Sequence, residues 1–248
     1  MPITDALPAP PRVLSEQITL VYGDPKDGKS TLVAGFDSVC FLATEAGLKH
    51  LSVPRWSAAD GRYVITSWPE LLEATAEVLR SGRFKTIAID TIGNACLLCE
   101  QYVCQKHGEE WKGDGKLGFG KGTALIVGEL RRYLNKLSAL KVGLVMIAHA
   151  ERRTIDERTG KYEKAVPFLP GDNKKLELYN AVLGMADLVL YCHKDPSGKR
   201  VLRTKPHTTY DAGDRSGALP DPLPMSPAAL STAFNTTTNT PAPAGAQG

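Results

Sequence analysis

The chain has 248 residues, five cysteines and a formal net charge of +3 at pH 7, so we expect one large domain or one domain with a tail. A charge this small does not require a nucleic-acid partner, although it permits a local basic surface. The first residues lack the basic-then-apolar pattern of a signal peptide, and no apolar run reaches the roughly 18 residues that span a bilayer. An odd number of cysteines suits a reducing compartment. We therefore expect a soluble, cytoplasmic protein with no membrane partner.

The first part of the chain is predicted to form a leader, a strand and a phosphate-binding loop. Residues 1–15 contain four prolines and are expected to be a loose leader. The apolar run at 18–22 predicts a buried strand, and residues 30–36 predict a helix. Between them, residues 23–30 fit the Walker A pattern of Gly, four residues, Gly, Lys and Ser or Thr. Because a strand precedes the motif and a helix follows it, we interpret it as a phosphate loop rather than a chance glycine-rich turn.

This motif supplies the groups that ATP binding needs. Gly23 and Gly28 let the backbone curl so that N–H groups point at phosphate oxygens, and the helix N-terminus adds partial positive charge. We expect Lys29 to reach the β- and γ-phosphates and the Ser30 hydroxyl to hold Mg²⁺. The predicted ATP-binding residues are Gly23, Asp24, Pro25, Lys26, Asp27, Gly28, Lys29, Ser30 and Thr31.

Strands and helices alternate in the middle of the chain. Apolar runs predict further strands at 38–45, 63–66, 84–91 and 142–149. Helices are predicted after a capping box that begins at Ser67, over the cysteine-bearing residues 94–104, and over 123–140. This alternation predicts an α/β fold in which helices flank a mainly parallel sheet.

Three of the predicted strands end in a side chain that suits nucleotide chemistry. Asp90 is placed where a carboxylate supports Mg²⁺ through water. Glu45 is the candidate general base, because a carboxylate at this edge of the sheet can deprotonate the attacking water. His149 is a candidate sensor of the γ-phosphate. The alternatives are solvated acids at the ends of strands for Glu45 and Asp90, and a structural histidine for His149.

A cysteine-rich segment invites a zinc interpretation. Cys96, Cys99, Cys104 and His107 have the spacing Cys-x2-Cys-x4-Cys-x2-His. On one straight helix, Cys96 and His107 would stand about 16 Å apart at roughly 1.5 Å per residue, whereas ligands of one zinc lie within about 5 Å of each other. We therefore favour small residues on the core face of a helix.

The second half of the chain predicts a hairpin, a helix and another hairpin. Residues 150–172 are polar and charged around a turn signal at 156–160, and a helix is expected over 173–185. The sequence Asp195-Pro196-Ser197-Gly198 separates two strand-like runs, which predicts a C-terminal hairpin.

The last residues predict a tail. Residues 226–248 carry no charge and are rich in Thr, Pro and Ala, so we expect them to be disordered. The predicted organisation is a leader at 1–15, one ATPase domain at 16–225 and a disordered tail at 226–248.

The order of these parts resembles the RecA-like recombinase ATPases, and more closely the compact phage RecA-like ATP-binding proteins related to Sak-type single-strand annealing proteins. The phosphate loop is specific only to the superfamily of P-loop proteins, whereas the later segments indicate which family within it the chain resembles. The resemblance extends over about residues 16 to 225. It is carried by residues 23–30, 41–48, 87–91, 145–149, 200–207 and 212–215.

The resemblance implies a RecA-like P-loop core that hydrolyses ATP with Mg²⁺. Glu45 takes the place of the recombinase catalytic glutamate, and His149 falls where recombinases carry a γ-phosphate-sensing glutamine. Arg203 and Lys205 match a strand that reaches across the subunit interface, so they are expected to act on a neighbour's nucleotide. A homo-oligomer with nucleotide at its interface follows. Because no long N-terminal polymerisation helix is evident, a filament, a small ring and a DNA-dependent oligomer all remain open.

The resemblance also implies a single-stranded DNA partner and a role in annealing or recombination. The expected DNA-binding loops are 108–122 and 150–172, which correspond to the two recombinase loops. Basic residues mixed with aromatic ones on such loops suit single strands, and the aromatic candidates are Trp111, Phe119, Tyr162 and Phe168. A phage-encoded protein would act in the host cytoplasm, and a single-strand-binding protein is a further candidate partner.

Two other functions fit the same phosphate loop. The first is a phosphotransferase acting on a small molecule, which would need an acceptor pocket and an arginine-rich lid; Arg152, Arg153 and Arg158 are candidates for that lid. The second is a non-catalytic module in which ATP only controls assembly or DNA binding.

Overall fold

The computed structural model describes residues 13–157, 160–171, 177–217 and 219–238. Most of the predicted leader and the last ten residues of the predicted tail lie outside these ranges. None of the described helices is long and apolar enough to cross a lipid bilayer.

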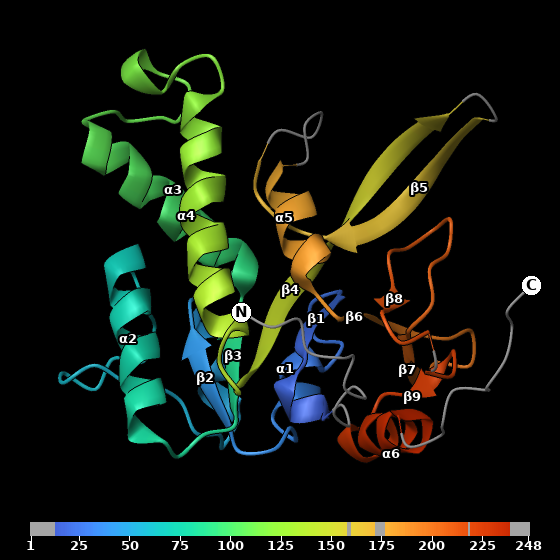
Figure 1. Cartoon of the computed structure of the whole chain (residues 1–248). Helices are drawn as coiled ribbons and strands as arrows, with labels where there is room; N and C mark the ends of the chain where they lie inside the picture. The colour runs from blue at the N-terminus through green and yellow to red at the C-terminus, as the bar shows by residue number, and fades with distance from the viewer. Residues whose placement is uncertain (1–12, 158–159, 172–176, 218, 239–248) are drawn as a thin grey trace, which may run out of the picture.

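A mainly parallel sheet forms the centre of the fold (Figure 1), as predicted. Its order is β2-β3-β4-β1-β6-β7-β9, and β1, β2, β3, β4 and β6 run parallel where they pair. The strands β7, β8 and β9 join antiparallel beyond β6, as does β5 beside β4. The strand bounds are β1 Ile18–Gly23, β2 Val39–Ala43, β3 Thr86–Asp90, β4 Gly143–Glu157, β5 Gly160–Pro167, β6 Leu188–Lys194, β7 Arg200–Arg203, β8 Gly213–Asp214 and β9 Leu223–Pro224.

Helices cover both faces of this sheet because its strands are apolar on both faces. In β1, Leu20 and Tyr22 join the core on one face and Val21 joins the core on the other, as the alternation of side chains in a strand requires. The first core includes residues of α2 (Trp68–Ser81), α3 (Ile92–His107), α4 (Lys121–Ser138) and α5 (Glu177–Met185). The second includes residues of α1 (Lys29–Val33) and α6 (Pro227–Thr238).

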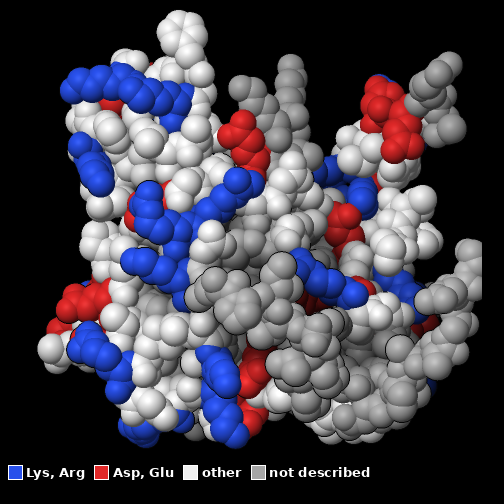
Figure 2. Space-filling model, viewed as in Figure 1, with Lys and Arg blue, Asp and Glu red and all other residues white. Residues whose placement is uncertain are grey.

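Two arms project on the same side of the sheet (Figure 1). The helical arm consists of α3, α4 and the tip loop, residues 108–120, which joins them. The ribbon consists of residues 150–157 of β4 and the antiparallel partner β5, paired from Ala150 with Pro167 to Glu157 with Gly160. Figure 2 shows Lys and Arg over the outer part of the helical arm, and Asp and Glu near the outer end of the ribbon.

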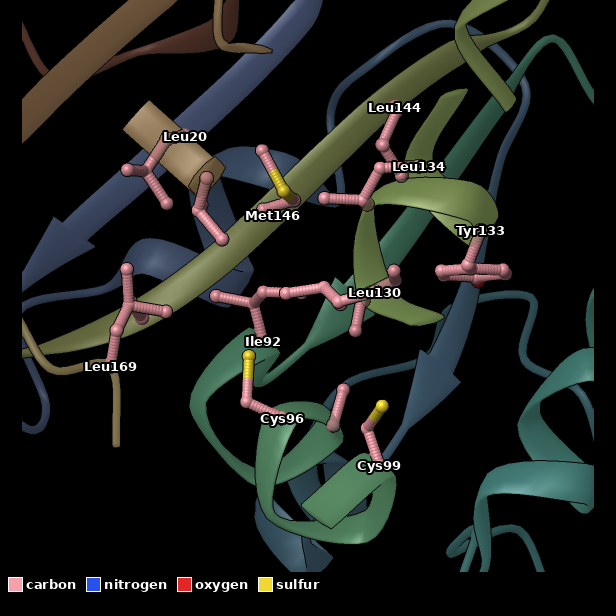
Figure 3. Close-up of a cluster of buried hydrophobic side chains, with 14 of the residues drawn as sticks. Leu20, Ile92, Cys96, Cys99, Leu130, Tyr133, Leu134, Leu144, Met146 and Leu169 are labelled. Carbon is pink, nitrogen blue, oxygen red and sulfur yellow. The ribbon is translucent and has the colours of Figure 1, made fainter. Parts of the chain in front are cut away.

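The cysteine-bearing segment is one helix, and its cysteines are core residues. Cys96, Cys99 and Cys104 are buried along α3. Figure 3 shows Cys96 and Cys99 among the side chains of Ile92 and Leu130, which fill the core beneath α3 and α4. Burial raises the pKa of the Cys99 thiol to about 12, so this thiol is an inert packing group at neutral pH. The core interpretation of these cysteines is confirmed.

The predicted disordered tail is wrong for residues 227–238, which form α6. Leu230 and Phe234 are one helical turn apart, and both are buried in the second core. The Ser226 hydroxyl accepts a hydrogen bond from the Ala229 N–H at 3.1 Å, which caps the helix. The prediction rested on the average composition of the tail, which is polar and rich in Ala and Pro. Two apolar residues one turn apart are nevertheless enough to dock a short helix against the second core.

Two predicted strands differ from the structure. Residues 63–66 make only an isolated bridge between Val64 and Ala43, instead of a strand. The strand expected at 142–149 continues to Glu157, because its outer part pairs with β5. The hairpin predicted for 150–172 is therefore confirmed in its pairing, and it is continuous with the central sheet.

Candidate nucleotide site at the carboxyl edge of the sheet

The strand register brings the predicted site residues to one edge of the sheet. Gly23, at the end of β1, lies opposite His149 of β4. Asp90, at the end of β3, lies opposite Ala43 of β2, two residues before Glu45. Because carboxyl ends of parallel strands form the ligand-binding edge of open α/β sheets, this register predicts one shared site.

Two threonines fasten the ends of β2 and β3 to each other. The Thr44 hydroxyl donates to the Thr91 carbonyl at 2.8 Å and accepts from the Thr91 N–H at 2.9 Å. The Thr44 N–H also donates to the Asp90 carbonyl at 2.7 Å. Both threonines are buried. These bonds fix the backbone positions from which Glu45 and Asp90 extend.

The phosphate loop has the backbone that its glycines predict. Gly28 has φ +93°, a left-handed conformation that favours glycine. Gly23 has no space for a side chain, because a Cβ there would lie 2.4 Å from the Cys192 carbonyl oxygen of β6. The loop therefore passes close to β6 before it turns into α1.

The Lys29 side chain is folded into its own loop. Its Nζ donates to the carbonyl oxygens of Gly23 at 3.0 Å and Asp24 at 2.9 Å. The residue is only 6% exposed, and burial lowers the pKa of its ammonium below the ordinary value. A phosphate that enters the loop can replace these neutral carbonyl partners with charged ones, which are stronger acceptors.

Ser30 and Asp90 form an oxygen pair that fits the predicted magnesium site. The Ser30 hydroxyl donates to Asp90 Oδ2 at 2.7 Å. Burial raises the pKa of the Asp90 carboxyl, and the hydrogen bond from Ser30 opposes this rise. Hydroxyl and carboxylate oxygens suit the hard Mg²⁺ ion, which keeps several waters and binds substrate phosphates as well. Mg²⁺ would supply charge stabilisation to the phosphates here.

Glu45 is held by hydrogen bonds at both of its carboxylate oxygens. His149 Nε2 lies 3.2 Å from Oε1, and Asn94 Nδ2 donates to Oε2 at 3.1 Å. The hydrogen bond with His149 is the largest cause that lowers the pKa of the Glu45 carboxyl, and burial opposes it. Glu45 is therefore a charged carboxylate at neutral pH, as a general base must be.

A cavity of about 390 Å³ joins these groups. This volume falls in the range of small-ligand pockets, roughly 300–1,000 Å³. Its walls include six of the predicted ATP-binding residues, together with Glu45, Asp90 and His149; the six are Pro25, Lys26, Gly28, Lys29, Ser30 and Thr31. Of the other three, Asp24 pairs with Arg152 at 3.4 Å, Asp27 is buried, and the Gly23 carbonyl accepts a hydrogen bond from Lys29.

The two predicted basic fingers do not line this cavity. Arg203 donates to His193 at 3.0 Å and pairs with Asp221 at 3.3 Å, and Lys205 donates to the Gly217 carbonyl at 3.2 Å. Because both were expected to act on the nucleotide of a neighbouring subunit, their role stays a prediction.

Two residues near the nucleotide were not predicted from the sequence. Arg200 lines the cavity from β7 and donates to the Lys26 carbonyl at 3.4 Å. It lies in the segment 200–207 that carries the family resemblance, in which only Arg203 and Lys205 are predicted to act on nucleotide. Asn94 contacts Glu45 from the first turn of α3. A polar residue in the first turn after the Asp90 strand is the signal that could have indicated it.

A family model described as an AAA domain matches residues 15–216. The chain belongs to this AAA domain family. Its members are P-loop proteins, generally ATPases, that bind nucleotide and typically use ATP with Mg²⁺. No curated protein matches the chain. The match to the AAA domain confirms the P-loop assignment, while the finer resemblance to phage RecA-like and Sak-type proteins stays a prediction.

Proposed function

We propose that this AAA domain protein is an ATPase stimulated by single-stranded DNA, and that it assists strand annealing or recombination as a phage-encoded protein in a host cytoplasm. The supporting observation is the tip loop of the helical arm. Phe119 is fully exposed, with a relative accessibility of 111%, and Trp111 is 56% exposed. The helical arm that ends in this loop projects on the same side of the sheet as the ribbon, which continues β4 beyond His149 at the nucleotide cavity (Figure 1).

Exposed aromatic rings with lysines nearby suit the bases of a single strand. Stacking of a base on an aromatic side chain contributes about 1–3 kcal/mol and tolerates any sequence. Lys116 and Lys121 are exposed on either side of Phe119 along the chain, where they can meet backbone phosphates. The tip loop therefore offers both interactions that sequence-independent binding of a single strand uses.

The ribbon supports the proposal less directly. Lys161 pairs with Asp156 at 3.1 Å, and Tyr162 donates to Glu157 at 3.0 Å. Figure 2 shows Asp and Glu near its outer end. At its base, Arg152 pairs with Asp24 of the phosphate loop, and Phe168 lies against Gly93 of α3. We assign the ribbon to communication with the nucleotide, and primary DNA contact to the tip loop.

The chemistry of hydrolysis follows from the groups at the cavity. Glu45 accepts a proton from water, whose oxygen then attacks the γ-phosphorus while the bond to the leaving ADP oxygen breaks. Lys29 and the N–H groups of the loop stabilise the charge that develops on the phosphate oxygens. Ser30 and Asp90 would hold Mg²⁺ beside them.

The test is ATP hydrolysis with and without single-stranded DNA, with Lys29→Ala as the inactive control. We expect DNA to stimulate turnover in the unmodified protein and no turnover in Lys29→Ala. A Trp111→Ala/Phe119→Ala variant should bind single-stranded DNA about tenfold more weakly or worse. Leu140→Ala, which removes a 45% exposed residue just beyond the far end of α4, is the matched control. If DNA neither binds nor changes turnover, the proposal is wrong.

A second candidate function is phosphoryl transfer to a small molecule. An open cavity of about 720 Å³, lined by residues between 49 and 63, adjoins the nucleotide cavity and shares His50 and Leu51 with it. Lys49 and Arg55 give this cavity a basic wall suited to an anionic acceptor. Two of the arginines predicted for a lid are already paired: Arg152 with Asp24 and Arg153 with Glu151. This pairing argues against a lid whose arginines are free to bind an acceptor. Isotope transfer from ATP to a metabolite instead of water would favour this second function.

A further inference from the structure

A ladder of aromatic rings runs from the phosphate loop to an exposed surface. Tyr22, the residue before Gly23, stacks on Tyr191 of β6 with 4.9 Å between the ring centroids. Tyr191 stacks in turn on Tyr210 at 5.3 Å, and Tyr210 stacks on His207 at 5.0 Å. Tyr22 and Tyr191 are buried, Tyr210 is half-buried and His207 is exposed. The ladder therefore ends in a ring that is open to solvent.

The two outer rings are held in place by several contacts. The Thr209 N–H donates to Nδ1 of His207 at 3.2 Å, and the Thr209 hydroxyl oxygen lies 2.8 Å from the same nitrogen. The Arg203 guanidinium lies 5.8 Å from the centre of the Tyr210 ring, which is within reach of a cation–π contact. The Ala165 N–H donates to the Thr209 carbonyl at 2.8 Å and fastens this segment to the ribbon strand β5. The pair of outer rings is thus a preformed platform beside the ribbon.

The platform has a face to which a further planar group can be added. Within the part of the chain that the structure describes, Tyr210 is the ring that stacks on His207. Because His207 is exposed, the opposite face of its ring is accessible. An unstacked nucleobase can extend such a ladder by one ring, since bases of any sequence stack on aromatic side chains and on histidine. Duplex bases are already stacked on each other, so this face favours a single strand.

We propose that His207 and Tyr210 form a second base-stacking site for single-stranded DNA, separate from the tip loop. This inference rests on the proposed function and adds a contact beside the ribbon to the one on the helical arm. Tyr191, in the middle of the ladder, is hydrogen-bonded to Arg152, which pairs with Asp24 of the phosphate loop at 3.4 Å. A base on this platform therefore lies at the end of a chain of contacts that begins at the phosphate loop.

Replacement of the outermost ring tests the site. His207→Ala should weaken the binding of an unstructured single-stranded oligonucleotide about five- to tenfold, because one stacked base is lost. His207→Phe keeps an aromatic ring and should bind within about twofold of the unmodified protein. Thr208→Ala, an exposed neighbour in the same segment, is the matched control and should leave the affinity unchanged. Thermal unfolding of each variant shows that the fold is retained.

Photocrosslinking to the unmodified protein locates the base without any substitution at the platform. A single strand that carries 5-iodouracil should crosslink to residues 204–212 as well as to the tip loop, because this base reacts with the aromatic side chain on which it stacks. In the Trp111→Ala/Phe119→Ala variant, the crosslink to the tip loop should be lost and the crosslink to residues 204–212 should remain.

Three results would overturn the inference. The first is that His207→Ala binds DNA as tightly as the unmodified protein, or that His207→Phe binds as weakly as His207→Ala. The second is a crosslink to the tip loop with none to residues 204–212. The third is that His207→Ala weakens ATP binding and leaves DNA binding unchanged, because the platform would then serve the base of a nucleotide. Failure of the unmodified protein to bind single-stranded DNA is a different outcome, which removes the proposed function itself.

Discussion

Glu45 and Asp90 are two carboxylates at one edge of the sheet with opposite shifts in pKa. Burial raises the pKa of Asp90, while the hydrogen bond with His149 lowers the pKa of Glu45. Such a separation assigns different roles to neighbouring acids. Asp90 is bound to the Ser30 hydroxyl and suits a metal, whereas Glu45 stays charged beside the cavity and suits the acceptance of a proton.

The first prediction tests Glu45 as the base. Glu45→Gln keeps the shape of the side chain but removes its ability to accept a proton, so we expect kcat to fall at least about a hundredfold. The affinity for ATP should stay within about threefold, because Lys29 and the loop backbone are unchanged. Equilibrium binding and steady-state hydrolysis measure the two effects. Glu73→Gln, an exposed glutamate on α2, is the control, and equal activity in both variants would contradict the assignment.

The second prediction concerns the pH dependence of hydrolysis. Because the pKa of Glu45 is lowered from 4.5 chiefly by His149, its carboxylate remains charged to a lower pH than an isolated glutamate, and protonation inactivates it only as the pH falls further. His149→Ala removes this cause, so the pKa of Glu45 should rise and the acid limb of the kcat profile should move to higher pH. A profile measured between about pH 4 and pH 8 decides this. An acid limb that stays in place would show that His149 does not tune Glu45.

At the scale of elements, α2 shows local sequence signals that determine a boundary. Ser67 is its N-cap, and the Ser67 hydroxyl accepts from the Glu70 N–H at 3.3 Å. The Glu70 carboxylate accepts in return from the Thr66 N–H at 2.7 Å. In the predicted capping box, the donor would be the N–H of the N-cap residue Ser67. Trp68, the first residue after the cap, is completely buried and packs edge-on against Tyr133, with 5.2 Å between the ring centroids. The cap thus sets the entry angle of a core residue.

The third prediction tests this cap. Ser67→Ala should reduce the free energy of unfolding by about 1 kcal/mol, which lowers Tm by about 2–4 °C in a domain of this size. Thermal unfolding with and without the substitution measures it. Ser52→Ala, in an exposed loop, should leave Tm unchanged, and an equal loss in both variants would show that the cap contributes nothing specific.

The sequence predicted elements whose signals are local and missed contacts that depend on three-dimensional packing. The phosphate loop, the strand ends at Glu45, Asp90 and His149, and α2 all carry short-range patterns, so their placement could be predicted. Asn94 meets Glu45 only because Thr44 and Thr91 join two strand ends, and no spacing in the chain encodes that contact. The helix α6 was missed because Leu230 and Phe234 stand alone in a polar segment and gain stability only by docking.

At the scale of the whole molecule, the positions of the arginines on β7 indicate how subunits could share a nucleotide. Arg200 lines the nucleotide cavity of its own chain. Arg203, on the same strand, is held by His193 and Asp221 away from that cavity. If the resemblance to recombinases extends to assembly, Arg203 serves the nucleotide of a neighbouring subunit, and Arg200 serves the nucleotide of its own.

The fourth prediction separates these two roles by mixing variants. Glu45→Gln and Arg203→Ala proteins should each be inactive, the second by about 10³-fold or more if it acts as a finger. When they are mixed in equal amounts and exchange subunits, about a quarter of the interfaces join an intact Glu45 to a neighbour's intact Arg203, so hydrolysis should return to about a quarter of the unmodified rate. Lys205→Ala provides a second finger variant at an exposed position, which guards against misfolding of Arg203→Ala.

Arg200→Ala is the matched control for this experiment, because Arg200 and Glu45 must belong to the same chain. Arg200→Ala should itself lower hydrolysis, because Arg200 lines the nucleotide cavity. Its mixture with Glu45→Gln contains no chain with both residues intact, so the mixture should show no more activity than the two proteins show separately. If hydrolysis returns when Glu45→Gln is mixed with Arg203→Ala, but not when it is mixed with Arg200→Ala, the nucleotide is shared between subunits. If neither mixture recovers activity although the subunits exchange, each chain hydrolyses ATP alone, and Arg203 is then a structural partner of Asp221 within its own chain.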